Sequence, residues 1–257
     1  MISFFGRVGG KHYSSKTIIQ YIDEETSKNI YVEPFCGASA VFFKKGYESK
    51  VEVLNDKDED IINIFKDIRE VDNLNDCDFT PIREVFNIFK EQVEFKSKKE
   101  RLYRNLYLSK TSFRSDRNCF IGEKNCLLEK HIKTGRNLKK EGYLKKYGDR
   151  LKKVNLYSQD YKDIIKKYDT EKTFFYLDPP YSQAHKQKDY KITGVSPKEI
   201  YDVVCNIKGK FLLSYDKTTS NIELFKKFNI IDLDVIYSTP KIKNKKLKEI
   251  LISNYKI

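Results

Sequence analysis

The chain has 257 residues, of which 50 are Lys or Arg and 37 are Asp or Glu, so its formal net charge is +13. A hydrophobic fraction of 39%, with 17 Phe and 18 Tyr, is enough for a packed core and excludes a wholly disordered chain. No apolar run approaches the roughly 20 residues that span a bilayer, and the first ten residues lack the apolar region of a signal peptide. We therefore expect a cytoplasmic protein with no membrane partner.

The five cysteines are scattered, with no C-x-x-C pair, and the three histidines lie far apart in the sequence. Zinc sites and disulfide frameworks both need closely spaced or paired ligands. We therefore expect reduced thiols and no metal site.

Short apolar runs alternate with amphipathic stretches at both ends of the chain. The first part predicts strands at 30–33 and 51–54, each followed by a helix, at 38–45 and 59–68. The last part predicts, in chain order, strand 154–157, helix 160–168, strand 174–177, helix 197–206, strand 211–214, helix 221–228 and strands 230–237 and 249–254. This alternation predicts an α/β fold with a mostly parallel sheet and helices on both faces, closed by an antiparallel C-terminal hairpin.

The middle of the chain breaks this alternation. It predicts successive helices at 82–89, 100–109 and 138–147 with no parallel strand between them. Residues 96–153 contain 19 Lys and Arg but only 6 Asp and Glu, a net charge of +13, so the remainder of the chain is neutral. A charge confined to one stretch indicates a polyanionic partner. We therefore predict one domain, built from 1–66 and 154–257, that carries a mainly helical, basic insertion at 67–153.

The run Asp178-Pro179-Pro180-Tyr181 follows the aromatic strand 174–177. Open α/β sheets bind ligands at the carboxyl ends of their strands, and the two prolines fix the backbone there. A carboxylate, the rigid carbonyl of Pro179 and the ring of Tyr181 suit a flat substrate that bears an NH2 group. The alternative interpretation is an ordinary strand-to-loop turn with an incidental Asp.

Three further motifs are weaker on their own. Glu33-Pro34-Phe35-Cys36-Gly37 ends the first strand with a glycine that permits close approach of a ligand. Asp56 follows the second strand, where acidic residues receive hydrogen bonds from ribose hydroxyls, although a helix N-cap would explain it as well. The N-terminal Gly9-Gly10-Lys11 alone fits any loop. No G-x-G-x-x-G pattern is present, so a nicotinamide-dependent oxidoreductase is not supported.

In combination and in this order, these motifs resemble the Dam-like family of DNA adenine N6-methyltransferases. The resemblance runs nearly end to end and is clearest at residues 5–66 and 154–257. It implies a Rossmann-like methyltransferase sheet, S-adenosylmethionine as the methyl donor, double-stranded DNA as the partner and a role in DNA methylation or restriction–modification. Within the insertion, residues 117–125 are similar to the family's base-reading hairpin.

The resemblance also implies roles for individual residues, which the local chemistry supports. The catalytic residues would be Asp178, Pro179, Pro180 and Tyr181. The residues around the donor would be Arg7, which stands where the family often has an aromatic residue, and Lys11, Glu33, Phe35, Gly37, Asp56, Asp160 and Asp178. The DNA-binding residues would be Arg114, Arg117 and Asn118. The two arginines suit this role because a guanidinium group can donate two hydrogen bonds to one guanine.

These residues predict a mechanism. Hydrogen bonds from the adenine amine to Asp178 and to the Pro179 carbonyl would make its nitrogen nucleophilic toward the methyl group. The base would have to leave the duplex and stack on Tyr181. Two alternatives stay open: a methyltransferase acting on RNA adenine or on cytosine N4, and a catalytically silent DNA-binding protein of the same fold.

Overall fold

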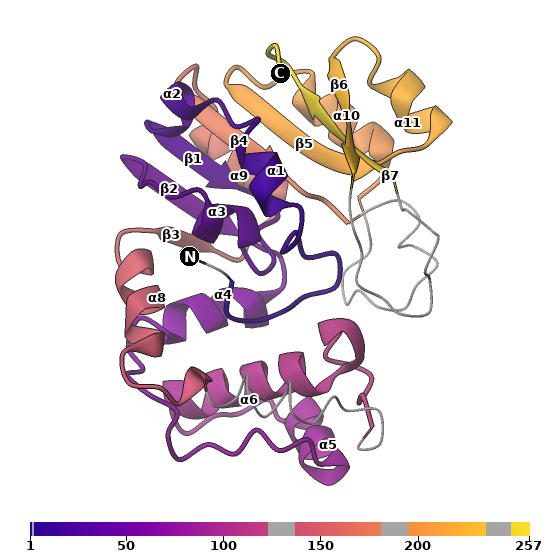
Figure 1. Cartoon of the computed structure of the whole chain (residues 1–257). Helices are drawn as coiled ribbons and strands as arrows, with labels where there is room; N and C mark the ends of the chain where they lie inside the picture. The colour runs from indigo at the N-terminus through magenta and orange to yellow at the C-terminus, as the bar shows by residue number, and fades with distance from the viewer. Residues whose placement is uncertain (2, 123–136, 181–194, 235–247) are drawn as a thin grey trace. The chain divides into compact units, whose positions relative to one another are not determined.

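The computed structural model describes residues 1, 3–122, 137–180, 195–234 and 248–257 (Figure 1). The chain divides into two compact units. The first, which we call the sheet unit, consists of Met1–Ser3, Gly9–Lys57 and Tyr157–Ile257; the second, the helical unit, consists of Phe4–Val8 and Asp58–Leu156. None of the described helices is long and apolar enough to cross a membrane.

A seven-stranded sheet has the order β3-β2-β1-β4-β5-β7-β6. In chain order the strands are β1 (Ile30–Glu33), β2 (Val51–Asn55), β3 (Asn155–Tyr157), β4 (Thr173–Leu177), β5 (Lys210–Asp216), β6 (Asn229–Asp234) and β7 (Lys248–Ser253). Strands β2, β1, β4 and β5 are parallel neighbours, whereas β7 is antiparallel to both β5 and β6. The predicted α/β fold and its antiparallel C-terminal hairpin are confirmed.

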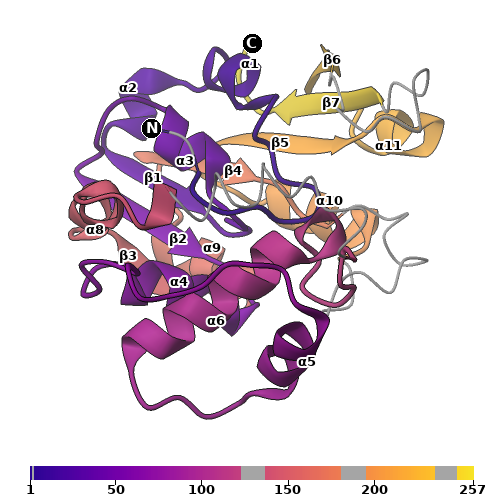
Figure 2. The same cartoon turned by 60° about the horizontal axis from the view of Figure 1, so that its bottom comes forward.

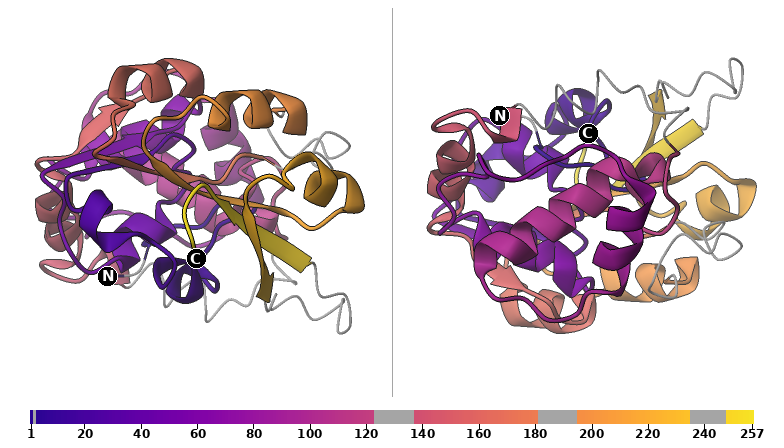
Figure 3. Two further views of the ribbon diagram at one scale, coloured as in Figure 1. Left: turned by 90° about the horizontal axis from the view of Figure 1, so that it is seen from above. Right: turned by 90° about the horizontal axis from the view of Figure 1, so that it is seen from below.

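The central strands are apolar on both faces because helices cover both. Alternate side chains such as Val32, Phe175 and Leu213 lie in one core cluster with residues of α9 (Tyr161–Tyr168) and α10 (Pro197–Val204). Figure 3 (left) shows the indigo helices of the N-terminal part on the opposite side of the sheet from α10. Side chains two residues apart therefore face the same helix layer.

The remaining helices of the sheet unit are short: α1 (Ser15–Ile19), α2 (Glu24–Ser27), α3 (Ala40–Lys44) and α11 (Thr219–Leu224). Local side chains set where several helices begin. The Asp160 carboxylate accepts from the backbone N–H of Lys162 at the start of α9, and Ser196 and Glu199 form a reciprocal capping box at the start of α10.

The helical unit contains α4 (Glu59–Asp67), α5 (Arg83–Glu91), α6 (Lys98–Thr111), the 3-10 turn η1 (Phe113–Ser115) and α8 (Tyr143–Leu151). The long α6 packs against α4 and α5 (Figure 2; Figure 3, right). The N-terminal segment 4–8 belongs to this unit, because the ring of Phe5 packs on Phe65 of α4 and that of Phe4 on Tyr147 of α8. The boundaries of 67–153 as a recognition insertion stay a prediction.

One predicted helix differs clearly from the observed one. The sequence predicts a helix over 138–147, but α8 begins at Tyr143 because Gly142 has a φ of 70°, in the left-handed region that ends or precedes a right-handed helix. In the insertion, an isolated antiparallel bridge pairs Ser112 with Phe120, so a short hairpin-like loop is present there. Residues 123–125 of the predicted hairpin lie outside the described residues.

The strand order creates a switch point between β1 and β4. From β1 the chain continues outward to β2 in one direction, and from β4 it continues to β5 in the other. Loops that leave the carboxyl ends of such a pair diverge and leave room for a ligand. Glu33 ends β1 and Asp178 follows β4, so both predicted site residues lie at this switch point.

Candidate active site and nucleic-acid interface

An ion pair joins Asp178 to Lys11 at the end of β4. The Lys11 Nζ donates to Asp178 Oδ1 at 2.7 Å and lies 3.9 Å from Glu249 Oε2 of β7. Lys11 is only 5% exposed, so one buried cation serves two carboxylates. The structure thus brings Lys11 and Asp178, two of the residues predicted to surround the donor, into direct contact.

Burial and charge oppose each other in this pair. Removal from water is the larger effect on Asp178 and raises its pKa to about 6, although the Lys11 charge acts in the opposite direction. Burial by itself lowers the pKa of Lys11, but the charges of Asp178 and Glu249 outweigh burial and leave that pKa above its ordinary value. Near neutral pH the pair therefore consists of a carboxylate and an ammonium group.

A second acid lies at the end of β1. Glu33 is buried, and its Oε1 accepts a hydrogen bond of 2.7 Å from the Tyr31 hydroxyl, two residues earlier on the same face of the strand. Burial raises the pKa of Glu33 to about 8 despite this hydrogen bond. Such a group holds a proton near neutral pH and gives it up when a cation approaches.

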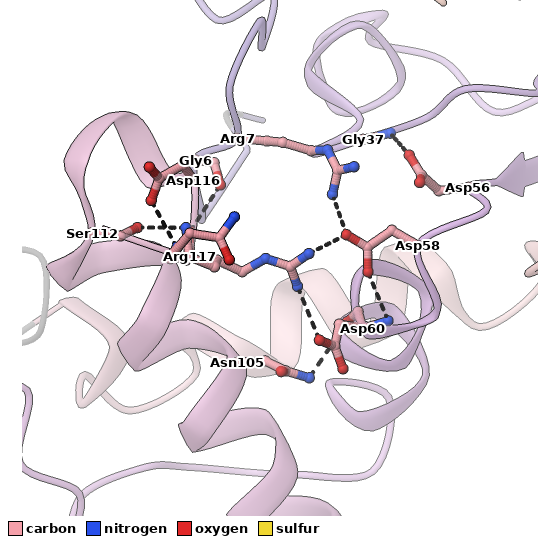
Figure 4. Close-up of polar contacts among 12 residues, drawn as sticks. Gly6, Arg7, Gly37, Asp56, Asp58, Asp60, Asn105, Ser112, Asp116 and Arg117 are labelled. Atoms are coloured by element: carbon pink, nitrogen blue, oxygen red, sulfur yellow. Dashed lines mark hydrogen bonds and ion pairs between the residues drawn. The ribbon is translucent and has the colours of Figure 1, made fainter. Parts of the chain in front are cut away.

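The turn after β1 is tied to the end of β2. The Gly37 N–H donates to Asp56 Oδ2 at 2.9 Å, so these two predicted donor-binding residues are in direct contact (Figure 4). The Asn55 side chain donates to the Pro34 carbonyl at 2.9 Å and to the Gln159 carbonyl at 3.1 Å. Asn55 thereby fixes the loops after β1 and β3 relative to β2.

The two remaining donor-binding candidates of the sheet unit lie near the start of α9. The Phe35 ring packs on the Tyr161 ring with centroids 4.7 Å apart. The Asp160 carboxylate caps α9 and has an Oδ2 3.7 Å from the Lys57 Nζ. Phe35 thus presents an aromatic surface next to the helix that Asp160 begins.

The catalytic motif is described up to its second proline. Pro179 is buried and Pro180 is partly buried, directly after Asp178. Tyr181 lies outside the described residues, so its predicted stacking role stays a prediction.

The DNA-binding candidates lie in the loop 112–120 of the helical unit. Arg117 is buried, and its guanidinium donates to Asp58, which also accepts a hydrogen bond of 2.8 Å from Arg7 (Figure 4). The Asn118 N–H donates to Asp116 Oδ1 at 2.8 Å. Arg114 belongs to η1, and its side chain lies outside the described part of the structure. Arg7, predicted to contact the donor, is thus found in an ion pair of the helical unit.

Comparison with known proteins identifies the family. A model of the D12 class N6 adenine-specific DNA methyltransferases matches residues 8–239, which include the N-terminal loop, the basic middle section and the Asp178 motif. The chain belongs to this family. It is also similar to the type II methyltransferase M.MjaIII of Methanocaldococcus jannaschii, with 25% identity over 93% of this chain and 89% of that protein.

Membership of the D12 class confirms the resemblance to adenine N6-methyltransferases and, with the sheet order, the Rossmann-like methyltransferase fold. Two residues of the candidate site were not predicted from sequence, namely Glu249, which lies beside Lys11, and Asn55, which braces the loops. A lone acid in the apolar strand 249–252 is a signal for the first, since buried acids need a partner. Among the described residues, no group of His, Cys, Asp and Glu could hold a metal ion.

Proposed function

We propose that this protein transfers a methyl group from S-adenosylmethionine to the N6 amine of an adenine that has left a DNA duplex. The observation that carries the proposal is the Asp178 carboxylate, held by Lys11 at the switch point of the sheet in a chain of the D12 class. The roles predicted from sequence for Asp178, Lys11 and the donor-binding residues are part of this proposal.

The side chains at the switch point suit this donor. S-adenosylmethionine is a cation that also carries hydroxyl groups, and the site offers the buried acids Glu33 and Asp56 and the partly buried Asp178. Ribose hydroxyls donate well to an acid at the end of the second strand, the position of Asp56. When bound, the donor supplies an electrophilic methyl group.

Asp178 acts as a hydrogen-bond acceptor in this proposal. A carboxylate has about four lone-pair positions, so the Lys11 contact on Oδ1 leaves acceptor capacity for an adenine amine. The Pro179 carbonyl supplies a second acceptor, and both stabilise the positive charge that develops on the nitrogen during attack. A group with a pKa of about 6 is too weak a base to deprotonate a neutral amine, so N6 gives its proton to Asp178 or to water only after the methyl group has bonded.

Lys11 holds the acceptor in place. Its ammonium group keeps Asp178 ionised and oriented, while Glu249 holds the ammonium from the other side. Preorganisation of this kind matters because a positioned charge acts without reorganising during the reaction.

We further propose that the basic middle section binds double-stranded DNA, that methylation is specific to a short sequence and that the enzyme works in the cytoplasm. The similar M.MjaIII is named a type II methyltransferase. This chain would accordingly belong to a restriction–modification system.

The test is labelled-methyl transfer from S-adenosylmethionine to duplexes of varied sequence, followed by mapping of the modified base. We expect label on adenine N6, and Asp178→Ala should lower the single-turnover rate by at least about two orders of magnitude, the effect expected for one positioned charge-stabilising group. Circular dichroism of the variant checks that its fold is retained. Label on RNA or on cytosine would favour the alternative substrates, and donor binding without transfer to any of them would indicate a silent protein.

A further inference from the structure

Three arginines and two aspartates form a largely buried cluster at the start of α4 in the helical unit. We call it the Asp58 cluster; its members are Arg7, Arg104, Arg117, Asp58 and Asp60. The arginines come from three separate segments, namely 4–8, α6 and the loop 112–120. The cluster therefore joins parts of the chain that lie far apart in sequence.

Asp58 is shared by two of these arginines. Its Oδ2 accepts from Arg7 Nη1 at 2.8 Å and from Arg117 Nη2, as Figure 4 shows. Arg117 Nη1 also lies 3.5 Å from Asp60 Oδ2, which accepts from Arg104 at 3.0 Å. Asp58 and Arg117 are each 8% exposed, so the pair is shielded from water, and removal of Asp58 deprives a buried guanidinium of its shorter ion pair.

The loop that Arg117 belongs to is conformationally constrained. Ser115 and Arg117 have φ values of 59° and 60°, in the left-handed region that residues other than glycine rarely adopt. Such backbone conformations are kept only where the surrounding structure restrains them. Here the Ser112 hydroxyl accepts from the Arg117 N–H at 2.9 Å, and the Arg117 side chain anchors the loop to α4.

The segment 4–8 is fixed in the same place. The Ser109 hydroxyl donates to the Gly6 carbonyl at 2.8 Å, and a Cβ added at Gly6 would lie 2.5 Å from the Ser115 hydroxyl oxygen. The segment therefore packs directly on the loop, with Arg7 reaching Asp58 from one side and Arg117 from the other. In sequence this segment leads to Lys11, and Asp58 comes two residues after Asp56.

We propose that Asp58 is a positioning residue for target recognition, which fixes the loop 112–120 by holding the Arg117 guanidinium. This inference rests on the proposed function and on the prediction from sequence that the loop contacts bases. Discrimination between bases depends on donors held at fixed positions, because a loosely held donor adjusts to the wrong base as well. Asp58 thereby sets how strictly the enzyme selects its target without touching DNA itself.

The test compares the wild type with Asp58→Asn, which keeps the size of the side chain and an oxygen that can cap α4 but removes the charge. The measurement is the ratio of kcat/KM for the target duplex to that for a duplex with one base pair changed. We expect this ratio to fall about tenfold, the lower end of the discrimination given by one good arginine contact. The fall should come from a higher KM for the target, whereas kcat at saturating DNA and the Kd for S-adenosylmethionine should change by less than about twofold.

Asp23→Asn is the matched control. Asp23 also caps a helix, α2, and also pairs with a cation, Lys210 at 2.9 Å, but it belongs to the sheet unit. Its substitution should leave the discrimination ratio unchanged. An unchanged ratio in folded Asp58→Asn would overturn the inference.

The double variant Asp58→Asn with Arg117→Met removes both charges and so avoids an uncompensated arginine if the single variant does not fold. If Asp58 acts through Arg117, the double variant discriminates no worse than Arg117→Met alone. Effects that multiply would overturn the inference. Failure of the wild type to methylate adenine would instead overturn the proposed function, and the wild-type assay shows this independently of the variants.

Discussion

Glu33 shows how burial changes the protonation of a single residue. Its carboxyl group is enclosed at the end of β1, where it accepts a hydrogen bond from the Tyr31 hydroxyl, and burial raises its pKa to about 8. At pH 7 the free protein therefore holds a proton there. A cation that binds beside it favours the ionised form and lowers this pKa.

This leads to a prediction about donor binding. S-adenosylmethionine should release a large fraction of one proton from Glu33 at pH 7, and its affinity should rise as the pH increases toward about 8, because ionisation then costs less. Calorimetry in two buffers with different ionisation enthalpies measures the protons released.

Glu33→Gln is the control for that experiment, since it keeps the shape and cannot ionise. It should bind the donor more weakly and with no release from this position. Equal binding enthalpies in both buffers for the wild type would contradict the prediction.

At the scale of elements, α8 depends on a glycine that lies against backbone. A Cβ at Gly148 would lie 2.6 Å from the Ile68 carbonyl oxygen at the end of α4, and that atom belongs to the main chain and cannot turn aside. The glycine therefore sets how closely α8 approaches the residues that follow α4.

In Gly148→Ala, overpacking should cost about 3 kcal/mol, the upper end of its usual range, because the clash is with main chain. The gain in helix propensity from alanine, about 1 kcal/mol, offsets part of this cost, so the free energy of unfolding should fall by about 2 kcal/mol. Urea denaturation measures the change. Asp149→Ala, an exposed neighbour with a surface ion pair to Lys152, should change stability by less than about 0.5 kcal/mol. Equal stabilities for the wild type and Gly148→Ala would disprove the packing argument.

Elements with strong local patterns were predicted well from sequence. The strand 30–33 agrees with β1, because a β-branched and aromatic run ending before Pro34 is a local signal. The short α1 and α2 were not predicted. They have five and four residues, too few for the apolar pattern of a helix to repeat, and Ser14 makes no side-chain cap at the start of α1.

The candidate site was predictable residue by residue but not in its contacts. Asp178 and Gly37 are recognisable because each closely follows a strand. The pairing of Lys11 with Asp178 joins residues 167 positions apart, and that of Arg117 with Asp58 joins residues 59 apart. Periodicity and spacing contain no information on such distant pairs, so only the folded chain reveals them.

For the whole molecule, the structure redistributes the charge seen in the sequence. Residues 58–95 carry 11 Asp and Glu against 4 Lys and Arg, and they belong to the same compact unit as the basic stretch 96–153. Several cations of α6 are paired with these acids: Lys98 with Glu70, Lys99 with Asp76, Arg101 with Asp67 and Arg104 with Asp60. The helical unit as a whole has a net charge of +7. We therefore expect the phosphate contacts to come mainly from lysines that follow α6 in the sequence, in the part 140–153 of the basic stretch.

A charge variant tests this. The exposed lysines chosen for replacement by Gln are Lys140, Lys145, Lys146 and Lys153. Affinity for duplex DNA should fall, and the slope of log affinity against log salt should become shallower by up to about 0.9 for each phosphate that the variant no longer binds. Fluorescence anisotropy at several salt concentrations measures both, and donor binding should stay the same.

The control replaces four exposed lysines of the sheet unit, Lys166, Lys172, Lys208 and Lys256, with Gln. It lowers the net charge by the same amount, so it separates a local contact from a general effect of charge. If the affinity of both variants falls equally, the phosphate contacts do not lie in 140–153.

The position of β7 has a consequence for how the protein is made. Among the described strands, β7 comes last in sequence yet lies between β5 and β6, and it places Glu249 beside Lys11, 238 positions earlier. During synthesis, β5 must wait with an unpaired edge until residue 253 has left the ribosome, and unpaired edges of this kind favour aggregation. The ion pairs around Lys11 are completed only when Glu249 has been made, so the N-terminal half of the site depends on a strand that is synthesised long after it.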